Sequence, residues 1–190
     1  ERLKSDEARV AEQELSLVSV YEITRKMSAS LTFDDIFNVF SACLNDYVGF
    51  TTCDLLIFRR DDGEPRLDRR YRVIKEPGSE GVSEKAVDYD RLLRVFLARP
   101  REVFITREDG PQAFVSFGLP EEGMESFAGI PLLSDKTVVA ALIFQNMPRD
   151  DFEKAVILSM QFALEIKKVL LYETVERLSV TDSLTGLYVR

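Results

Sequence analysis

The stretch that decides the fold is residues 138–144, which have the sequence VVAALIF. Every side chain in this run is apolar, which indicates a strand that is buried on both faces and lies in the middle of a sheet. Segments 126–133 and 137–146 are separated by Ser134-Asp135-Lys136, so we expect them to pair as a hairpin. The small side chains of Ala140 and Ala141 leave room for a helix to pack closely on this strand.

A second hairpin is expected earlier in the chain. Residues 55–58 have the sequence LLIF, which predicts that 51–60 is another central strand. After a turn at 61–63, apolar and charged residues alternate over 66–73, as they do in a strand with one exposed face. The arginines of this strand suggest either a phosphate site or a solvated sheet face, and the neighbouring Asp and Glu favour the solvated face. They are Arg66, Arg69, Arg70 and Arg72.

Helices are expected around these strands. Residues 30–49 have one broad apolar face, with Thr32 and Asp35 as a capping box and Gly49 as the stop. Further helices are predicted over 6–29 and over 84–98, where Pro100 ends the second. A short strand at 102–106 is followed by a long loop over 107–123, of a length that often binds a ligand.

The last helix is expected over 150–179, about 45 Å long at 1.5 Å per residue. Such a helix is longer than a small domain is wide, so its first half is expected to pack on the domain and its second half to project. Apolar residues recur along it every seven positions, as in a coiled coil, although Lys168 interrupts the seam. A helix docked entirely on its own domain is the alternative. The seam comprises Ile157, Leu164, Leu171 and Leu178, with Val175 between the last two.

Composition narrows the function. The chain has 190 residues, of which 45% are hydrophobic and 31% charged, and this suits one globular domain with long helices. A net charge of −8 argues against nucleic acid or an anionic membrane as a partner. Histidine is absent, which excludes a Ser-His-Asp triad and the commonest metal ligand. We expect no catalytic residue and no metal site, and we interpret Cys43 and Cys53 as reduced core residues.

Targeting signals are also missing from the sequence. No apolar run approaches the ~20 residues of a membrane helix, and no signal peptide is visible. We therefore expect a cytoplasmic location and no direct membrane contact in this segment. An anchor before residue 1 stays open.

The order of these elements resembles a GAF domain over about residues 15–175. The matching pieces are the helix opening at 31–36, the strand at 128–132, the strand at 139–143 and the exit through 150–152. The resemblance implies an α+β fold of the PAS/GAF superfamily, in which helices flank a central, mainly antiparallel sheet. The long N- and C-terminal helices would pack on one sheet face. PAS domains are the nearest competitor.

The last residues are similar to the opening segment of GGDEF domains, Asp-x-Leu-Thr-Gly-Leu-x-Asn-Arg. Asp182-Ser183-Leu184-Thr185-Gly186-Leu187 match it, and Val189 stands where Asn is expected. GGDEF enzymes condense two GTP molecules into cyclic di-GMP, with metal ions and two facing protomers. GTP and Mg would therefore belong to a cyclase domain that is absent from this chain. For the chain itself we expect no cofactor and no enzymatic activity. The expected divisions are a linker helix (1–14), a GAF-like domain (15–165), a coiled-coil linker (166–180) and the start of GGDEF (181–190).

These resemblances imply a sensory domain that controls a diguanylate cyclase through a helical linker. The expected partner is a second copy, paired through the terminal helices at Leu164, Leu171, Val175 and Leu178. An unidentified small ligand would bind between the sheet and segment 84–127. The chain lacks a cyclic-nucleotide signature, and without His it cannot match bilin-type or His-ligated haem sites. The alternatives are a ligand-free dimerisation module and a sensor on a degenerate GGDEF receptor. The candidate pocket residues are Phe114, Phe117 and Ser126. The alternative for Phe114 and Phe117 is that they fold back on the core.

Overall fold

The computed structural model describes residues 21–29, 32–61, 64–75, 87–120, 123–134 and 137–180. The chain divides into two compact units. The sheet unit is Leu44–Ala163, and the helical unit combines Glu1–Cys43 with Leu164–Arg190. The predicted linker over 1–14 and the GGDEF-like segment 181–190 lie outside the described residues, so the domain boundaries expected from sequence stay predictions.

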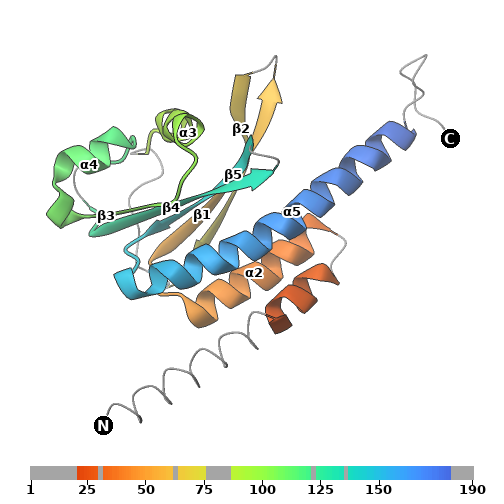
Figure 1. Cartoon of the computed structure of the whole chain (residues 1–190), viewed down its shortest axis with the longest axis horizontal. Helices are drawn as coiled ribbons and strands as arrows, with labels where there is room; N and C mark the ends of the chain where they lie inside the picture. The colour runs from red at the N-terminus through yellow and green to blue at the C-terminus, as the bar shows by residue number, and fades with distance from the viewer. Residues whose placement is uncertain are drawn as a thin grey trace, which may run out of the picture. The chain divides into compact units, whose positions relative to one another are not determined.

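The sheet unit is built on five strands in the order β2-β1-β5-β4-β3, and every neighbouring pair is antiparallel (Figure 1). β1 and β5 pair with each other and each with one further strand, which confirms the prediction that both are central. The two edge strands are β2 and the four-residue β3. The bounds are β1 Thr52–Asp61, β2 Glu64–Ile74, β3 Val103–Thr106, β4 Ser126–Ser134 and β5 Thr137–Gln145.

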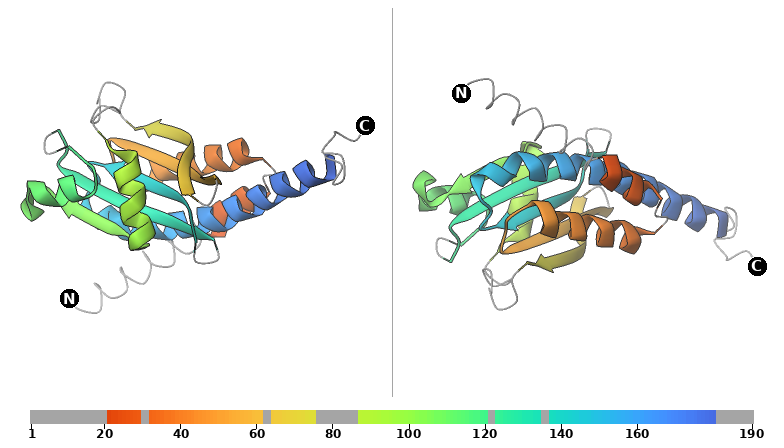
Figure 2. Two further views of the ribbon diagram at one scale, coloured as in Figure 1. Left: turned by 90° about the horizontal axis from the view of Figure 1, so that it is seen from above. Right: turned by 90° about the horizontal axis from the view of Figure 1, so that it is seen from below.

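Both faces of this sheet are covered by helices. Helix α3 (Tyr89–Ala98) lies on one face, and the first turns of α5 (Phe152–Val180) lie on the other (Figure 2). Leu56 and Ala141 pair across β1 and β5 and belong to the core beneath α3. Because side chains alternate along a strand, the neighbouring pair of Leu55 and Leu142 points to the opposite face. This double burial is the physical reason for the uninterrupted apolar runs.

The helical unit contains a helix over 21–28, most of α2 (Phe33–Tyr47) and the part of α5 from Leu164 onward. Thr32 caps α2 as predicted, because its hydroxyl accepts a hydrogen bond from the Asp35 amide (3.2 Å) and donates one to the Asp35 carboxylate (2.7 Å). The buried apolar side chains of this unit come from all three helices. They include Ile23, Met27, Ile36, Phe40, Ile166 and Val169.

Gly49 does not end α2 in the way that its sequence position suggests. A terminating glycine usually adopts a positive φ angle, but Gly49 is not among the residues with one. A Cβ atom at this position would lie 3.0 Å from Pro148 and from the carboxylate of Asp151. The Gly49 amide donates a hydrogen bond to that carboxylate (2.8 Å). Close packing, and not backbone conformation, therefore explains this glycine.

Two elements between β2 and β4 differ from the predictions. Helix α3 begins at Tyr89 because the Asp88 side chain accepts a hydrogen bond from the Arg91 amide. Val87 and Asp88, which were expected to be helical, therefore lie before the helix. Residues 107–116 are not a loop: a 3₁₀ turn (Arg107–Asp109) leads into α4 (Pro111–Ser116). Pro111 occupies the first position of α4. Proline is tolerated there because an amide at this position would have no acceptor within the helix.

Helix α5 is continuous. It follows a 3₁₀ turn (Arg149–Asp151) and runs for 29 residues, with no break near Lys167. In the sheet unit it is anchored by Phe152, whose ring meets Phe104 of β3 edge-to-face at 5.2 Å. Within the part of the chain that the structure describes, no helix has both the length and the apolar character needed to span a membrane.

Candidate functional site

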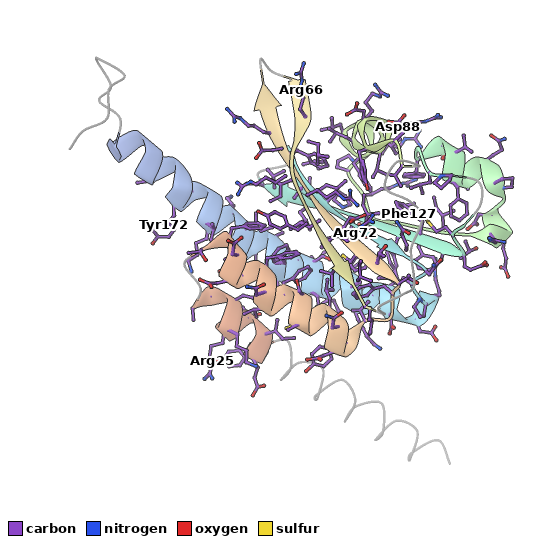
Figure 3. All side chains as sticks on the ribbon, turned by 180° about the vertical axis from the view of Figure 1, so that it is seen from behind. Arg25, Arg66, Arg72, Asp88, Phe127 and Tyr172 are labelled. Carbon is purple, nitrogen blue, oxygen red and sulfur yellow. The ribbon has the colours of Figure 1, made fainter. Side chains whose placement is uncertain are left out.

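The space between the sheet and α3, where sequence reasoning places a ligand, is packed with side chains. Phe114 of α4 is buried in this core, together with Leu92 and Phe96 of α3 and Phe127 of β4. Phe127 is labelled on the sheet in Figure 3. Gly129 marks how tightly the layers meet, because a Cβ atom there would lie 2.6 Å from the Phe96 ring. The centre of this face is therefore a hydrophobic core.

A groove opens beside this core, where the end of α3, the start of β3 and the end of α4 meet. Its volume is about 340 Å³. Of the candidate pocket residues, Phe117 lines this groove and Phe114 does not. Ser126 is buried at the start of β4, where its hydroxyl donates to the Met147 carbonyl (2.7 Å), and it does not line the groove either. The lining residues are Val95, Ala98, Arg99, Arg101, Val103, Ser116 and Phe117.

The floor of the groove is held by aromatic packing. The ring of Phe117 lies 6.4 Å from the ring of Phe96 and 6.0 Å from that of Phe127, both tilted. Such aromatic pairs add stabilisation beyond the area that they bury. Gly118 follows Phe117 with a φ of 76° and approaches the Asp88 carbonyl so closely that a Cβ atom would lie 2.7 Å from it. The end of α4 is thus fixed to the start of α3.

A buried ion-pair cluster lies on β1 and β2 of the same sheet. Asp54 is buried on central strand β1, and Arg72 of β2 binds it with two hydrogen bonds of 2.7 and 2.8 Å. Arg70 donates two longer ones of 3.2 Å, and its guanidinium lies 5.2 Å from the centre of the Tyr89 ring. Arg70 and Arg72 therefore hold a buried carboxylate, so the expectation that all four arginines form a solvated face is wrong for these two.

The pKa shifts of Cys53 and Asp151 arise from burial and from hydrogen bonds within the fold. Burial, with a smaller contribution from the charge of Asp54, raises the pKa of the Cys53 thiol well above its ordinary value. Both Cys43 and Cys53 are free and buried. Partial burial opposes ionisation of Asp151, but hydrogen bonds from Lys154 and the Gly49 amide outweigh it and lower the pKa of that carboxyl. Among the described residues, no cluster of Cys, Asp and Glu is suited to bind a metal ion.

An apolar stripe lies exposed along α5. The exposed fractions are 45% for Ile157, 64% for Leu164, 64% for Leu171 and 54% for Val175. Tyr172, which projects from the same helix in Figure 3, is also exposed. The side chain of Leu178, the last predicted seam residue, lies outside the described part of the chain. Lys168, which interrupts the seam, donates a hydrogen bond to the Ser28 carbonyl (2.9 Å).

Solved structures share this architecture, whereas no protein-family model and no curated protein matches the sequence. The GAF domain of a phosphoenolpyruvate-protein phosphotransferase from Coxiella burnetii is 17% identical, with a TM-score of 0.54. It covers 84% of this chain, and 96% of its own length is matched. The GAF domain of a sensor histidine kinase from Bacillus halodurans is 20% identical, with coverages of 76% and 99% and a TM-score of 0.51. The chain has the GAF fold.

A third solved structure, of the GAF domain/HD domain protein from Geobacter sulfurreducens, is 18% identical with a TM-score of 0.51. It covers 76% of this chain and is itself matched over 98% of its length. The chain therefore matches nearly the whole length of each of these GAF structures. At these identities the likeness carries the fold and no ligand.

Sequence reasoning about this GAF fold missed the residues that give its sheet a polar site. Asp54 stands immediately before the apolar run 55–58 of β1, directly opposite Arg72 in the pairing of β1 and β2. A lone acid in a strand expected to be buried on both faces signals a partner, because a buried charge without one is costly. The sequence therefore indicates that Asp54 has a partner. It does not give the register of β1 and β2, which is needed to identify that partner as Arg72.

Proposed function

We propose that the chain is the sensory domain of a signalling protein, that it pairs with a second copy through its terminal helices, and that it controls a C-terminal diguanylate cyclase. The observation that carries the proposal is the exposed apolar stripe on α5, formed by Ile157, Leu164, Leu171 and Val175. The GAF fold supports the sensory role, and α5 runs as one helix toward the C-terminus.

The stripe is consistent with a regulated, weak dimer. Full burial of one such side chain contributes ~1.5–3 kcal/mol. Because these four are already about half covered, two chains together gain on the order of 6–12 kcal/mol. Association costs about 4–15 kcal/mol. The two quantities nearly cancel, so the helices alone support a concentration-dependent dimer whose geometry a small signal can change.

The cyclase assignment depends on the GGDEF-like segment 182–187. Its partner domain would bring GTP and Mg, and cyclic di-GMP synthesis would require two such domains to face each other. Pairing through α5 would bring them together, and a change of register or angle between the two copies of α5 would alter their encounter.

Sedimentation velocity over a range of concentrations tests the pairing. The native chain should shift from monomer to dimer, and Leu171→Glu with Val175→Glu should abolish the shift. Lys167→Glu is the matched control, because it makes the net charge more negative by the same amount at an exposed position of α5 outside the stripe. If both the native chain and the full-length protein stay monomeric at every concentration, relay through α5 is contradicted. Full-length protein that makes no cyclic di-GMP from GTP and Mg contradicts the cyclase.

A ligand-free dimerisation module is the second candidate. The packed core beneath α3 favours it, since Phe96, Phe114 and Phe127 fill the middle of the face where a ligand was expected. A degenerate GGDEF receptor is distinguished by the same synthesis assay.

A further inference from the structure

The groove between α3, β3 and α4 combines an apolar floor with a cationic rim. The floor is formed by the half-buried side chains of Val95, Val103 and Phe117. The rim carries the exposed side chains of Arg99 and Arg101. Among the described residues that line the groove, none carries a carboxylate, although the chain as a whole has a net charge of −8. The charged side chains of the described lining are therefore positive, whereas the molecule as a whole is negative.

The two arginines are held near each other by a tight turn. The Arg101 amide donates a hydrogen bond to the Arg99 carbonyl (2.8 Å), and Pro100 between them has a restricted φ angle. Arg99 follows the last turn of α3, where the helix dipole favours a cation. Arg101 lies beyond that turn, so helix capping does not account for it. Both side chains nevertheless line the same groove.

The remaining rim residue adds a hydrogen-bonding group. The Ser116 hydroxyl donates to the Ala113 carbonyl (2.7 Å), which fixes the direction of its proton. The floor is preformed, because the Phe117 ring packs on Phe96 and Phe127. A volume of about 340 Å³ lies at the small end of the roughly 300–1,000 Å³ typical of small-molecule sites. A tetrapyrrole or a dinucleotide is too large for such a space.

We propose that this groove binds a small organic carboxylate with an apolar body, such as an aromatic ring or a short branched hydrocarbon. The apolar body packs on Val103 and Phe117, and the carboxylate meets the guanidiniums of Arg99 and Arg101, which suit it geometrically. This inference rests on the proposed sensory function and names the class of molecule sensed. A ligand here would contact α3, β3 and α4 without displacing the packed core.

Phenylacetate is a suitable probe, with phenylacetamide as its neutral counterpart and acetate as the anion without a ring. Calorimetric titration of the native chain should show phenylacetate binding at least about tenfold more tightly than either control. Equal binding of phenylacetate and phenylacetamide overturns the proposal, because charge would then play no role. So does the absence of phenylacetate binding at millimolar concentration.

Three variants locate the site. Arg99→Gln with Arg101→Gln should weaken phenylacetate binding about tenfold or more, and Ala98→Phe should block it by filling the groove from an exposed position of α3. Arg94→Gln, at another exposed arginine of α3 that does not line the groove, should bind normally. An equal loss in Arg94→Gln overturns the assignment. Sedimentation of the same proteins separates the two proposals: a dimer without phenylacetate binding refutes only the groove, and a monomer that binds refutes only the relay.

Discussion

The carboxylate of Asp54, buried on the central strand β1, is gripped by the guanidinium of Arg72 through two hydrogen bonds of 2.7 and 2.8 Å. The two residues are directly opposite in the pairing of β1 and β2. Arg70, two residues before Arg72 and so on the same face of β2, binds the same carboxylate. A single acid thus fixes two cations at the boundary of a hydrophobic core.

Replacement of Asp54 is expected to destabilise the sheet unit severely. Asp54→Leu removes the buried carboxylate that both arginines bind, and removing one partner of a buried pair costs about 3–5 kcal/mol. Urea denaturation followed by circular dichroism measures the change in the free energy of unfolding. Asp68→Leu is the control, because Asp68 forms an exposed pair with Arg69, and such pairs contribute roughly 0–1 kcal/mol. Similar losses in both variants would show that the buried site has no special role.

Gly129→Ala should destabilise the core beneath α3 by roughly 1–3 kcal/mol through overpacking. The added Cβ atom would lie 2.6 Å from the Phe96 ring and 3.1 Å from that of Phe127. Phe96→Leu removes the nearest of these atoms, so the double variant should lose less stability than the two single variants together. Thermal and urea denaturation of all four proteins give this coupling. Purely additive losses would contradict the contact.

Asp151 is expected to stabilise the fold in a pH-dependent way. Its pKa is lowered in the folded chain from the ordinary value of 3.8, so its contribution is complete above that pH and disappears as the pH falls through the lower folded-state pKa. Asp151→Asn keeps an acceptor for the Gly49 amide but loses the charge facing Lys154. Near neutral pH it should be about 0.5–1.5 kcal/mol less stable. The gap should close in acid, and a gap that stays constant with pH would refute the assignment.

Ser28 is expected to hold the helix over 21–28 to α5 within the helical unit. Its hydroxyl donates to the buried carboxylate of Glu165 (2.5 Å), and its carbonyl accepts from Lys168. Ser28→Ala should cost about 1–3 kcal/mol, because Glu165 loses a donor. Amide hydrogen exchange should show faster exchange over 21–28, while Arg25→Ala, at an exposed position, should leave it unchanged. Slower or unchanged exchange in Ser28→Ala would contradict this role.

The sequence predicts best what local chemistry determines. The apolar run at 138–144 identified a central strand because burial on both faces leaves no room for polar side chains. Thr32 identified the start of α2 because its hydroxyl satisfies a free amide. The prediction was wrong where a competing local signal was overlooked: Asp88 delays the start of α3, and Pro111 opens α4 inside a supposed loop.

The polar site and the groove depend on long-range pairing. Asp54 and Arg72 are 18 residues apart, and only the register of β1 and β2 sets them opposite each other. Arg99 and Phe117 likewise meet because α3 and α4 are both seated on the same core. Neither relationship has a local periodicity, so composition and spacing could not have revealed them.

The edges of the sheet have a consequence for how copies of this chain can associate. β3 is only four residues long, and β2 carries arginines along its length, so neither edge offers a long, neutral row of backbone groups to a neighbour. Short and charged edges are the features that protect natural sheets from strand-to-strand aggregation. Aggregation through edge-to-edge strand pairing is thereby disfavoured. Copies of this chain are expected to associate reversibly through their side chains instead.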